Sequence, residues 1–260
     1  MEHNYDDNFD YDRILQGILD IGEEMVIAGA EVNRVENSIY RMCEAYGADR
    51  INVFIITSNI QVTMEAPDER IVTHIRRVVR NEANFDRLDY LNDLSRTICA
   101  ETPGAQKLQE MLEAVMNRPQ QSRFLKFVGA VLVSGGFTVF FGGNFRDGIA
   151  AAIVGVVIVL VEVFLAEREK NQIVYHFAAS VVAGITAILL VRIGLGHNAD
   201  KIMIGGIMLL IPGIAMTNSI RDMLIGDVAS GMLRLSNALL VAAAIACGFA
   251  FTIIALGGVL

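Results

Sequence analysis

Five long apolar runs fill the second half of the chain, and only short polar stretches separate them. Each run is close to the ~20 apolar residues that a helix needs to cross a bilayer core. Backbone polar groups cannot face lipid unpaired, and the alternating pattern of a transmembrane strand is absent, so the runs predict packed transmembrane helices. The predicted spans are Phe127–Gly143, Gly148–Ala166, Ile173–Val191, Ile202–Ile220 and Leu235–Leu260.

The first 123 residues follow the shorter periods of ordinary helices and strands. Apolar spacing predicts helices from about Tyr11 to Ala28 and from Glu31 to Tyr46, with Gly47 as the stop of the second. Two β-rich runs joined at Ser58-Asn59 predict a hairpin, and a third run fits either a strand or a helix. The three runs are Ile51–Thr57, Ile60–Glu65 and Ile71–Val79, and two further helices are predicted around Leu88–Ile98 and Leu108–Val115.

These patterns divide the chain into a domain over residues 1–123 and a transmembrane domain over residues 124–260. The predicted fold class is a membrane all-α bundle of five transmembrane helices preceded by a small cytoplasmic α+β domain. The first part holds 22 acidic and 13 basic residues, a net charge of −9, and the rest holds 7 acidic and 8 basic residues, a net charge of +1. An acidic balance disfavours nucleic-acid binding, which needs a basic surface.

The charges that flank the runs predict that the N-terminus lies in the cytoplasm. Met1–Asp12 is acidic and lacks the apolar core of a secretory signal. With the N-terminus inside, seven flanking basic residues fall on the cytoplasmic side and three outside, as the positive-inside rule favours. The seven are Arg118, Arg123, Lys126, Arg168, Lys170, Arg221 and Arg234, and the three are Arg146, Arg192 and Lys201.

Two titratable residues lie within the predicted spans. Glu162 lies four residues before the end of the second span, and His176 lies three residues into the third. These depths match on adjacent antiparallel helices, so the two side chains could pair beside an inner vestibule and bind substrate or carry a proton. The alternative is that both side chains reach the lipid headgroups.

The stretch from Gly205 to Arg234 is the most informative part of the sequence. Pro212 removes a backbone donor and Gly213 loosens the next residue, which predicts a break in the fourth span. Interrupted helices expose backbone groups that transporters use for their cargo, and arginine can grip a carboxylate. The alternative is a simple kink, an aspartate cap and two ordinary basic anchors. The polar candidates are Thr217, Asn218, Ser219, Arg221, Asp222, Asp227 and Arg234.

Catalytic and metal-binding patterns are weak. His74, Ser95 and one of three aspartates could form a hydrolase triad, but no glycine-flanked nucleophile turn surrounds the serine. Four glutamates lack the spacing of a calcium loop, the phosphate-binding GxxxxGK[ST] is absent, and the three cysteines have no metal-ligand spacing. The sequence therefore predicts no enzyme, cofactor or metal site. The residues concerned are Asp86, Asp89 and Asp93, Glu23, Glu24, Glu31 and Glu36, and Cys43, Cys99 and Cys247.

Three segments of the chain resemble the threonine/serine exporter family: Gly29–Ala48, the strand-rich stretch through His74–Val78, and above all Gly206–Arg234. The chain is most similar to the YjjP-type half of the family, a cytoplasmic domain followed by five spans. The resemblance implies a multi-pass protein of the bacterial inner (plasma) membrane. It also implies a second, small membrane subunit of the YjjB type.

The resemblance implies a secondary exporter of small carboxylate-bearing molecules. These would be threonine and serine in the single-chain members, and succinate and similar dicarboxylates in the split ones. The alternative is a membrane-anchored sensor or scaffold whose cytoplasmic domain binds a partner. Substrate, coupling ion, stoichiometry and homo-oligomerisation stay open from the sequence.

Overall fold

The computed structural model describes residues 10–56, 58–79, 84–119, 122–165, 169 and 171–256. The chain divides into two compact units. The first comprises Met1–Gln120 together with Thr217–Arg234, and the second comprises Gln121–Met216 together with Leu235–Leu260. Among the predictions above, the strand end at Thr57, the basic residues Arg168 and Lys170, and the span ends at Ala166 and Leu260 lie outside the described residues.

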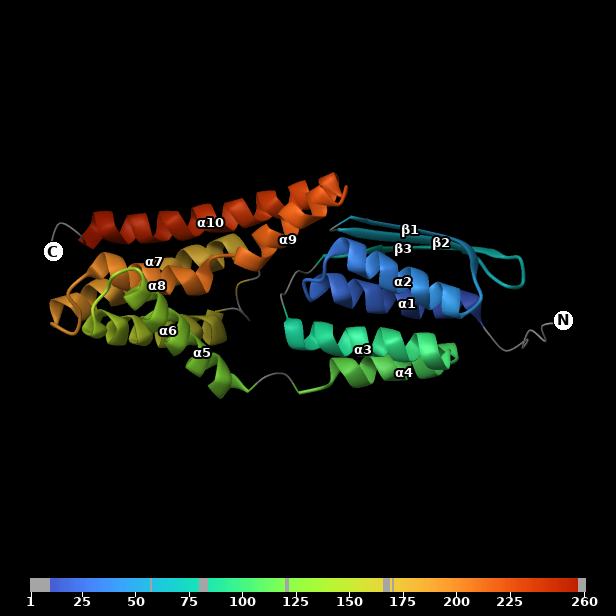
Figure 1. Ribbon diagram of the computed structural model, residues 1–260, viewed down its shortest axis with the longest axis horizontal. Coiled ribbons are helices and arrows are strands. Elements are labelled where there is room, and N and C mark those ends of the chain that lie inside the picture. Colours follow the sequence, from blue (N-terminus) through green and yellow to red (C-terminus); the bar gives the residue numbers. More distant parts are fainter. Residues whose placement is uncertain are drawn as a thin grey trace. The chain divides into compact units, whose positions relative to one another are not determined.

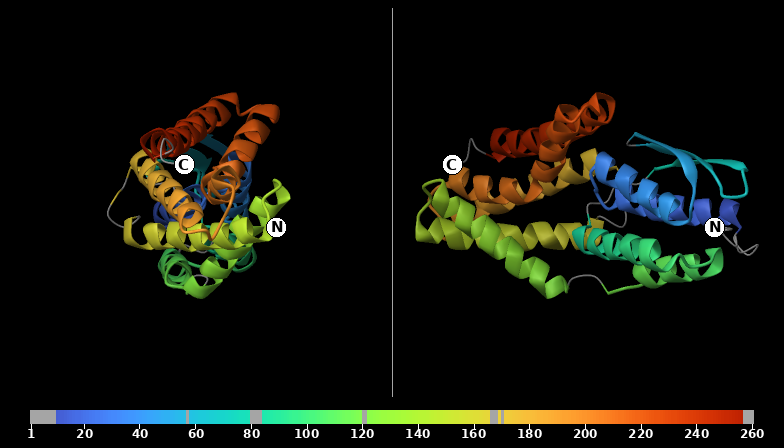
Figure 2. Two further views of the ribbon diagram at one scale, coloured as in Figure 1. Left: turned by 90° about the vertical axis from the view of Figure 1, so that its left-hand side faces the viewer. Right: turned by 45° about the vertical axis from the view of Figure 1, so that its right-hand side comes forward.

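The first unit has three layers (Figures 1 and 2). The middle layer holds α1 (Tyr11–Ile27) and α2 (Val32–Ala45). An antiparallel sheet of order β1-β2-β3 covers one side, and α3 and α4 lie on the other. The predicted helices and the hairpin are confirmed, and the third run is a strand. The remaining bounds are β1 (Asp49–Ile56), β2 (Asn59–Glu65), β3 (Ile71–Arg77), α3 (Phe85–Glu101) and α4 (Ala105–Met116).

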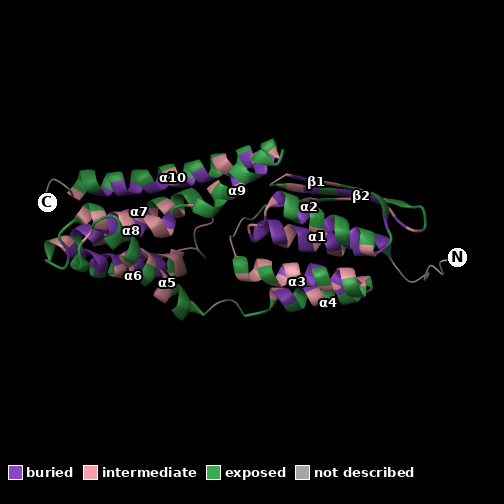
Figure 3. Cartoon of the chain, in the orientation of Figure 1, coloured by how far each residue is buried: buried purple, intermediate pink, exposed green. Residues whose placement is uncertain are grey.

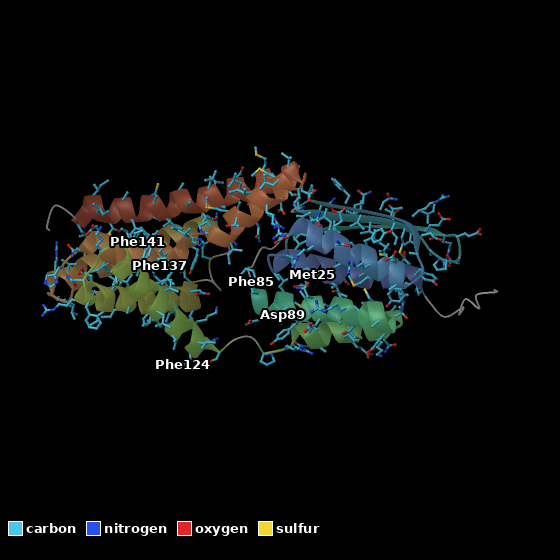
Figure 4. The ribbon with its side chains drawn as sticks, in the orientation of Figure 1. Met25, Phe85, Asp89, Phe124, Phe137 and Phe141 are labelled. Atoms are coloured by element: carbon cyan, nitrogen blue, oxygen red, sulfur yellow. The ribbon has the colours of Figure 1, made fainter. Side chains whose placement is uncertain are left out.

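Helix α1 forms the centre of this unit because apolar residues occupy most of its circumference. Ile14, Ile18 and Met25 are buried, and α1 packs against α2, α3, α4 and the sheet (Figures 3 and 4). Burial of each large aliphatic side chain contributes about 1.5–3 kcal/mol to stability. Gly47 ends α2 with a φ of +77°, a left-handed conformation that glycine adopts without strain, so the predicted stop is confirmed.

The long apolar helices over residues 123–256 account for most of the predicted spans. Four helices are long and apolar enough to cross a membrane, and the pair α8 and α9 would be a fifth span with a 54° bend. The five predicted spans therefore correspond to the upper number of candidates. These helices are α5 (Arg123–Phe140), α6 (Phe145–Leu165), α7 (Gln172–Arg192), α8 (Ala199–Leu210), α9 (Gly213–Leu224) and α10 (Val228–Leu256).

Small residues bring these helices into close contact. A Cβ on Gly155 of α6 would lie 2.8 Å from the backbone oxygen of Ala130 on α5. A Cβ on Gly248 of α10 would lie 2.7 Å from the backbone oxygen of Phe177 on α7. Such contacts are typical of transmembrane packing, where close backbone approach replaces the hydrophobic effect. Large apolar side chains such as Phe140 point outward instead, as the green faces of α5 and α10 show in Figure 3.

Candidate functional site

The predicted break at Pro212 is present. Helix α8 ends at Leu210, and α9 begins at Gly213. Proline has no N–H group, so the regular ladder of helical hydrogen bonds is interrupted here. A short Gly213 N–H to Ile211 carbonyl bond of 2.8 Å bridges the gap, and the ladder resumes when Met216 N–H bonds to the Pro212 carbonyl at 3.0 Å. The break separates two helical segments within one apolar stretch.

A buried charged pair lies beside the turn between α9 and α10, with Asp222 on α9 and Arg234 on α10. Asp222 is completely buried, and neither of its carboxylate oxygens has a hydrogen-bond partner among the described residues. The nearest cation is Arg234, whose Nη1 lies 3.6 Å from Oδ2 of Asp222. The Arg234 side chain is also largely buried, with 14% of it exposed. Burying a carboxylate is costly unless it is paired, so this ion pair has to offset the loss of hydration of both groups.

The same turn contacts the link between α1 and α2, within the first unit. Arg221 Nη1 lies 3.0 Å from Oε1 of Glu31, and Arg234 Nη2 donates to the backbone oxygen of Ala30 at 2.9 Å. The link turns at Gly29, whose φ is +94°. The two contacts join residues 190 and 204 positions apart. We call Glu31, Arg221, Asp222 and Arg234 the turn cluster.

Two further carboxylates lie at the edge of this cluster. Burial of Glu36, on the first turns of α2, raises its pKa, and the negative charge of Asp227 raises it further. Asp227 is the residue before α10, and its backbone carbonyl accepts a hydrogen bond from Gly231 N–H at 3.0 Å. Four carboxylates therefore lie near two arginines, which favours retention of a proton or binding of a cationic group. The four are Glu31, Glu36, Asp222 and Asp227.

The structure therefore brings together four of the predicted site residues, namely Arg221, Asp222, Asp227 and Arg234. Thr217 is exposed and Asn218 is half-buried on α9, while Ser219 is buried. Pro212 and Gly213 form the break, in the second unit. Both arginines already bind groups of the chain itself. A substrate carboxylate would have to displace Glu31 or Asp222 to reach them.

The predicted pair of Glu162 and His176 is not formed. Nζ of Lys126, on α5, lies 3.1 Å from Oε1 of Glu162, and both side chains are about half exposed. Nδ1 of His176 lies 2.7 Å from the backbone oxygen of Gln172, one turn earlier on α7. Among the described residues, no hydrogen bond or ion pair joins Glu162 to His176.

Comparison with known proteins follows the same lines as the geometry. The family model described as "Putative threonine/serine exporter" matches residues 16–256. The chain belongs to the threonine/serine exporter family. The resemblance found in the sequence is thereby confirmed.

Two curated members of the family match most of this chain. The chain is 23% identical over 235 residues to the "Threonine/serine exporter" of Corynebacterium glutamicum, which covers 88% of this chain and 48% of that protein. It is also 23% identical over 238 residues to the "Probable threonine/serine exporter" of Mycobacterium tuberculosis, which covers 91% and 45% respectively. The chain thus spans about half the length of these curated relatives. No solved structure matches it.

The residues considered for catalysis in this exporter-family chain do not assemble. Nε2 of His74 lies 2.9 Å from Oδ1 of Asp12, and the Ser95 hydroxyl donates to the Asn92 carbonyl at 2.8 Å. Ser95 is buried. The aspartates that the sequence offered as triad members, Asp86, Asp89 and Asp93, do not supply a partner to His74 in the contacts described.

Three of the four glutamates considered as cation ligands pair with arginines, Glu31 with Arg221 as described above. Glu23 lies 3.8 Å from Arg76, and Glu24 lies 3.8 Å from Arg87. Within the described part of this exporter-family chain, no group of three histidine, cysteine or acidic residues could hold a metal ion. The three cysteines are free thiols.

Sequence reasoning missed Asp147, a fully buried aspartate in the first turn of α6. Its oxygens accept hydrogen bonds from the backbone N–H groups of Asn144, His197 and Asn198 at 3.0, 2.6 and 3.0 Å, and from the Asn198 amide at 2.8 Å. Asn144 accepts a bond from Asp147 N–H in return, at 2.9 Å. This reciprocal pair resembles a capping box, so the Asn-x-x-Asp spacing ahead of an apolar run was a usable signal.

Proposed function

We propose that this protein is a membrane subunit of an exporter that moves small carboxylate-bearing molecules out of the cell. Family membership and the exporter names of the curated relatives support this proposal. The substrates would be threonine and serine or succinate-like dicarboxylates. The N-terminus would lie in the cytoplasm, and a small YjjB-type membrane protein would supply the other half of the pathway.

The observation that carries the proposal is the turn cluster that follows the broken span. Arginine can bind a carboxylate through two parallel hydrogen bonds. In the turn cluster, Arg221 contacts Glu31 through one nitrogen at 3.0 Å, and Arg234 lies 3.6 Å from Asp222. A substrate carboxylate that replaced Glu31 on Arg221 would break a link between the α9–α10 turn and the start of α2. Binding of cargo would then be coupled to release of the turn.

Efflux measurements test the proposal. Cells that express this chain with a small YjjB-type membrane protein are loaded with labelled threonine or labelled succinate, and loss of label is followed. We expect faster efflux of at least one compound than in cells without the pair. Arg221→Gln should slow this efflux, whereas Arg13→Gln, which removes an exposed ion pair with Asp10, should not. Equal efflux of both compounds with and without the pair would refute the proposal.

A second candidate is a membrane-anchored scaffold that binds a partner through its sheet. The outward face of the sheet exposes Phe54 (58%) and Ile75 (61%), which lie on β1 and β3 on either side of Gln61. Exposed apolar residues of this size are typical of interaction surfaces. A scaffold does not need a broken span, so Pro212→Ala would leave its function intact and would impair an exporter.

A further inference from the structure

A groove of about 700 Å³ lies between α2 and α3 in the first unit. One wall is the face of α2 that carries Ser38, Arg41 and Glu44, and the other is the face of α3 that carries Asn92, Ser95 and Cys99. The volume lies in the range of small-molecule sites, ~300–1,000 Å³. Helices that pack together usually bury apolar faces, so a polar groove between two of them is unusual.

The two walls offer complementary polar groups. The side chains of Arg41 and Glu44 form no hydrogen bond or ion pair with other described residues, and both line the groove. They are three residues apart on α2, so their side chains start about 5–6 Å from each other. The hydroxyl groups of Ser38 and Ser95 donate to the carbonyls of Arg34 and Asn92 and so offer only lone pairs to a ligand.

The charge of the groove differs from that of the domain around it. The first 123 residues carry a net charge of −9, from 13 basic and 22 acidic residues, so the domain as a whole repels anions. The groove is lined by two arginines and one glutamate. Arg96 is held by an ion pair with Asp93, which leaves Arg41 as the cation that is free to bind an anionic group.

We propose that this groove binds a small organic carboxylate that also carries a hydroxyl or ammonium group. The carboxylate would lie on Arg41, and the hydroxyl or ammonium group would donate to Glu44 and to the oxygen of Ser95. This site is separate from the turn cluster, because Arg41 lies ten residues, or about 15 Å of helix, beyond Glu31. The proposal does not depend on the transport function.

Cys99 provides a reporter inside the groove. Its thiol is half-buried there, whereas Cys43 is fully buried in the core. Burial raises the pKa of the Cys99 thiol, and Arg41 partly offsets this, so alkylation at a fixed alkaline pH is slow enough to follow. The full chain carrying Cys247→Ala would be placed in lipid nanodiscs and treated with iodoacetamide. A bound ligand that covers the groove would slow the reaction.

Three probes are compared at matched ionic strength: threonine, succinate and inorganic phosphate. We expect threonine to slow alkylation at the lowest concentration, because it alone carries a carboxylate together with hydroxyl and ammonium donors. In Arg41→Gln the half-protecting concentration should rise by about 10- to 100-fold, the loss expected for a charge-assisted hydrogen bond. Rates are compared with and without probe in each variant, since the substitution also changes the reactivity of the thiol.

Two controls separate this site from other effects. Arg77→Gln, an exposed arginine on β3, should leave protection unchanged. Arg221→Gln, in the turn cluster, should also leave protection unchanged even if it abolishes efflux. The proposal is overturned if none of the probes slows alkylation more than sodium chloride does, or if threonine protects Arg41→Gln as well as the parent protein. Failure of efflux with intact protection would instead count against the proposed function alone.

Discussion

Asp147 and Asp222 are both completely buried, yet their surroundings are opposite. Asp147, in the second unit, accepts four hydrogen bonds from two loops. Asp222, in the first unit, has no hydrogen-bond partner among the described residues and relies on Arg234 at 3.6 Å. A fully satisfied buried carboxylate is typical of a structural clamp, whereas a poorly satisfied one stores free energy that a ligand or a rearrangement can release.

The comparison separates two roles for buried charge in one chain. Asp147 joins the start of α6 to the segment that precedes α8 through hydrogen bonds of 2.6 to 3.0 Å. Asp222 lies near the end of α9, after the break, and its ion-pair partner is Arg234. We therefore expect substitutions at Asp147 to affect stability and substitutions at Asp222 to affect function.

The largest effect on stability is expected for Arg234→Ala. This change removes the ion-pair partner of Asp222 and the donor to the Ala30 carbonyl. Breaking a buried ion pair by removing one partner costs about 3–5 kcal/mol. The midpoint of thermal unfolding in detergent should fall strongly. Adding Asp222→Asn to this variant should recover part of the loss, and an unchanged or deeper loss in the double variant would show that the pair does not matter.

A smaller but still large loss of stability is expected for Asp147→Asn. The amide keeps the shape of the carboxylate but places an NH2 group opposite one pair of N–H donors. Leaving buried donors without an acceptor costs about 2–4 kcal/mol in sum. The same unfolding measurement applies, with Asp200→Asn, an exposed aspartate on α8, as the control. A midpoint equal to that of the control would mean that the clamp does not stabilise the protein.

The matched change Asp222→Asn should be tolerated far better. No hydrogen bond to the carboxylate is lost, the amide is cheaper to bury, and Arg234 keeps its bond to the Ala30 carbonyl, so the expected loss of unfolding free energy is smaller than for Arg234→Ala. Efflux should nevertheless fall, because a substrate carboxylate on Arg234 would no longer be displaced by Asp222 and would be released more slowly. Equal losses of stability in Asp147→Asn and Asp222→Asn would remove the distinction between the two sites.

Local signals in the sequence predicted most of the fold. The periodicity of α1 and α2, the stop at Gly47, the hairpin and the break at Pro212 each depend on residues close together in the chain. The site was predicted only in part. Four residues on and beside the turn between α9 and α10 were identified, but the contact of Arg221 with Glu31, 190 positions away, leaves no trace in periodicity.

The same limit explains the error at Glu162 and His176. Counting residues from the end of a span gives the depth of a side chain but not the side of the helix from which it projects. Lys126, on α5, lies beside Glu162 and forms the ion pair with it. Asp147 was missed for a related reason, since its partners His197 and Asn198 are 50 and 51 positions away.

The smallest expected effect is a change in the pH dependence of stability in Glu36→Gln. Burial and the charge of Asp227 raise the pKa of Glu36 in the folded protein, so the folded state binds this proton more tightly than the unfolded state. Stability from this group therefore rises as pH falls through the raised pKa and is complete below the ordinary glutamate value. Glu36→Gln should flatten the curve of unfolding midpoint against pH in that window, and it should raise the midpoint slightly at neutral pH.

Asp227→Asn should have part of the same effect, because it removes the second cause of the shift, and the double variant should then differ little from Glu36→Gln alone. Additive effects of the two changes would mean that the carboxylates do not interact, and the proton would have to be assigned elsewhere in the turn.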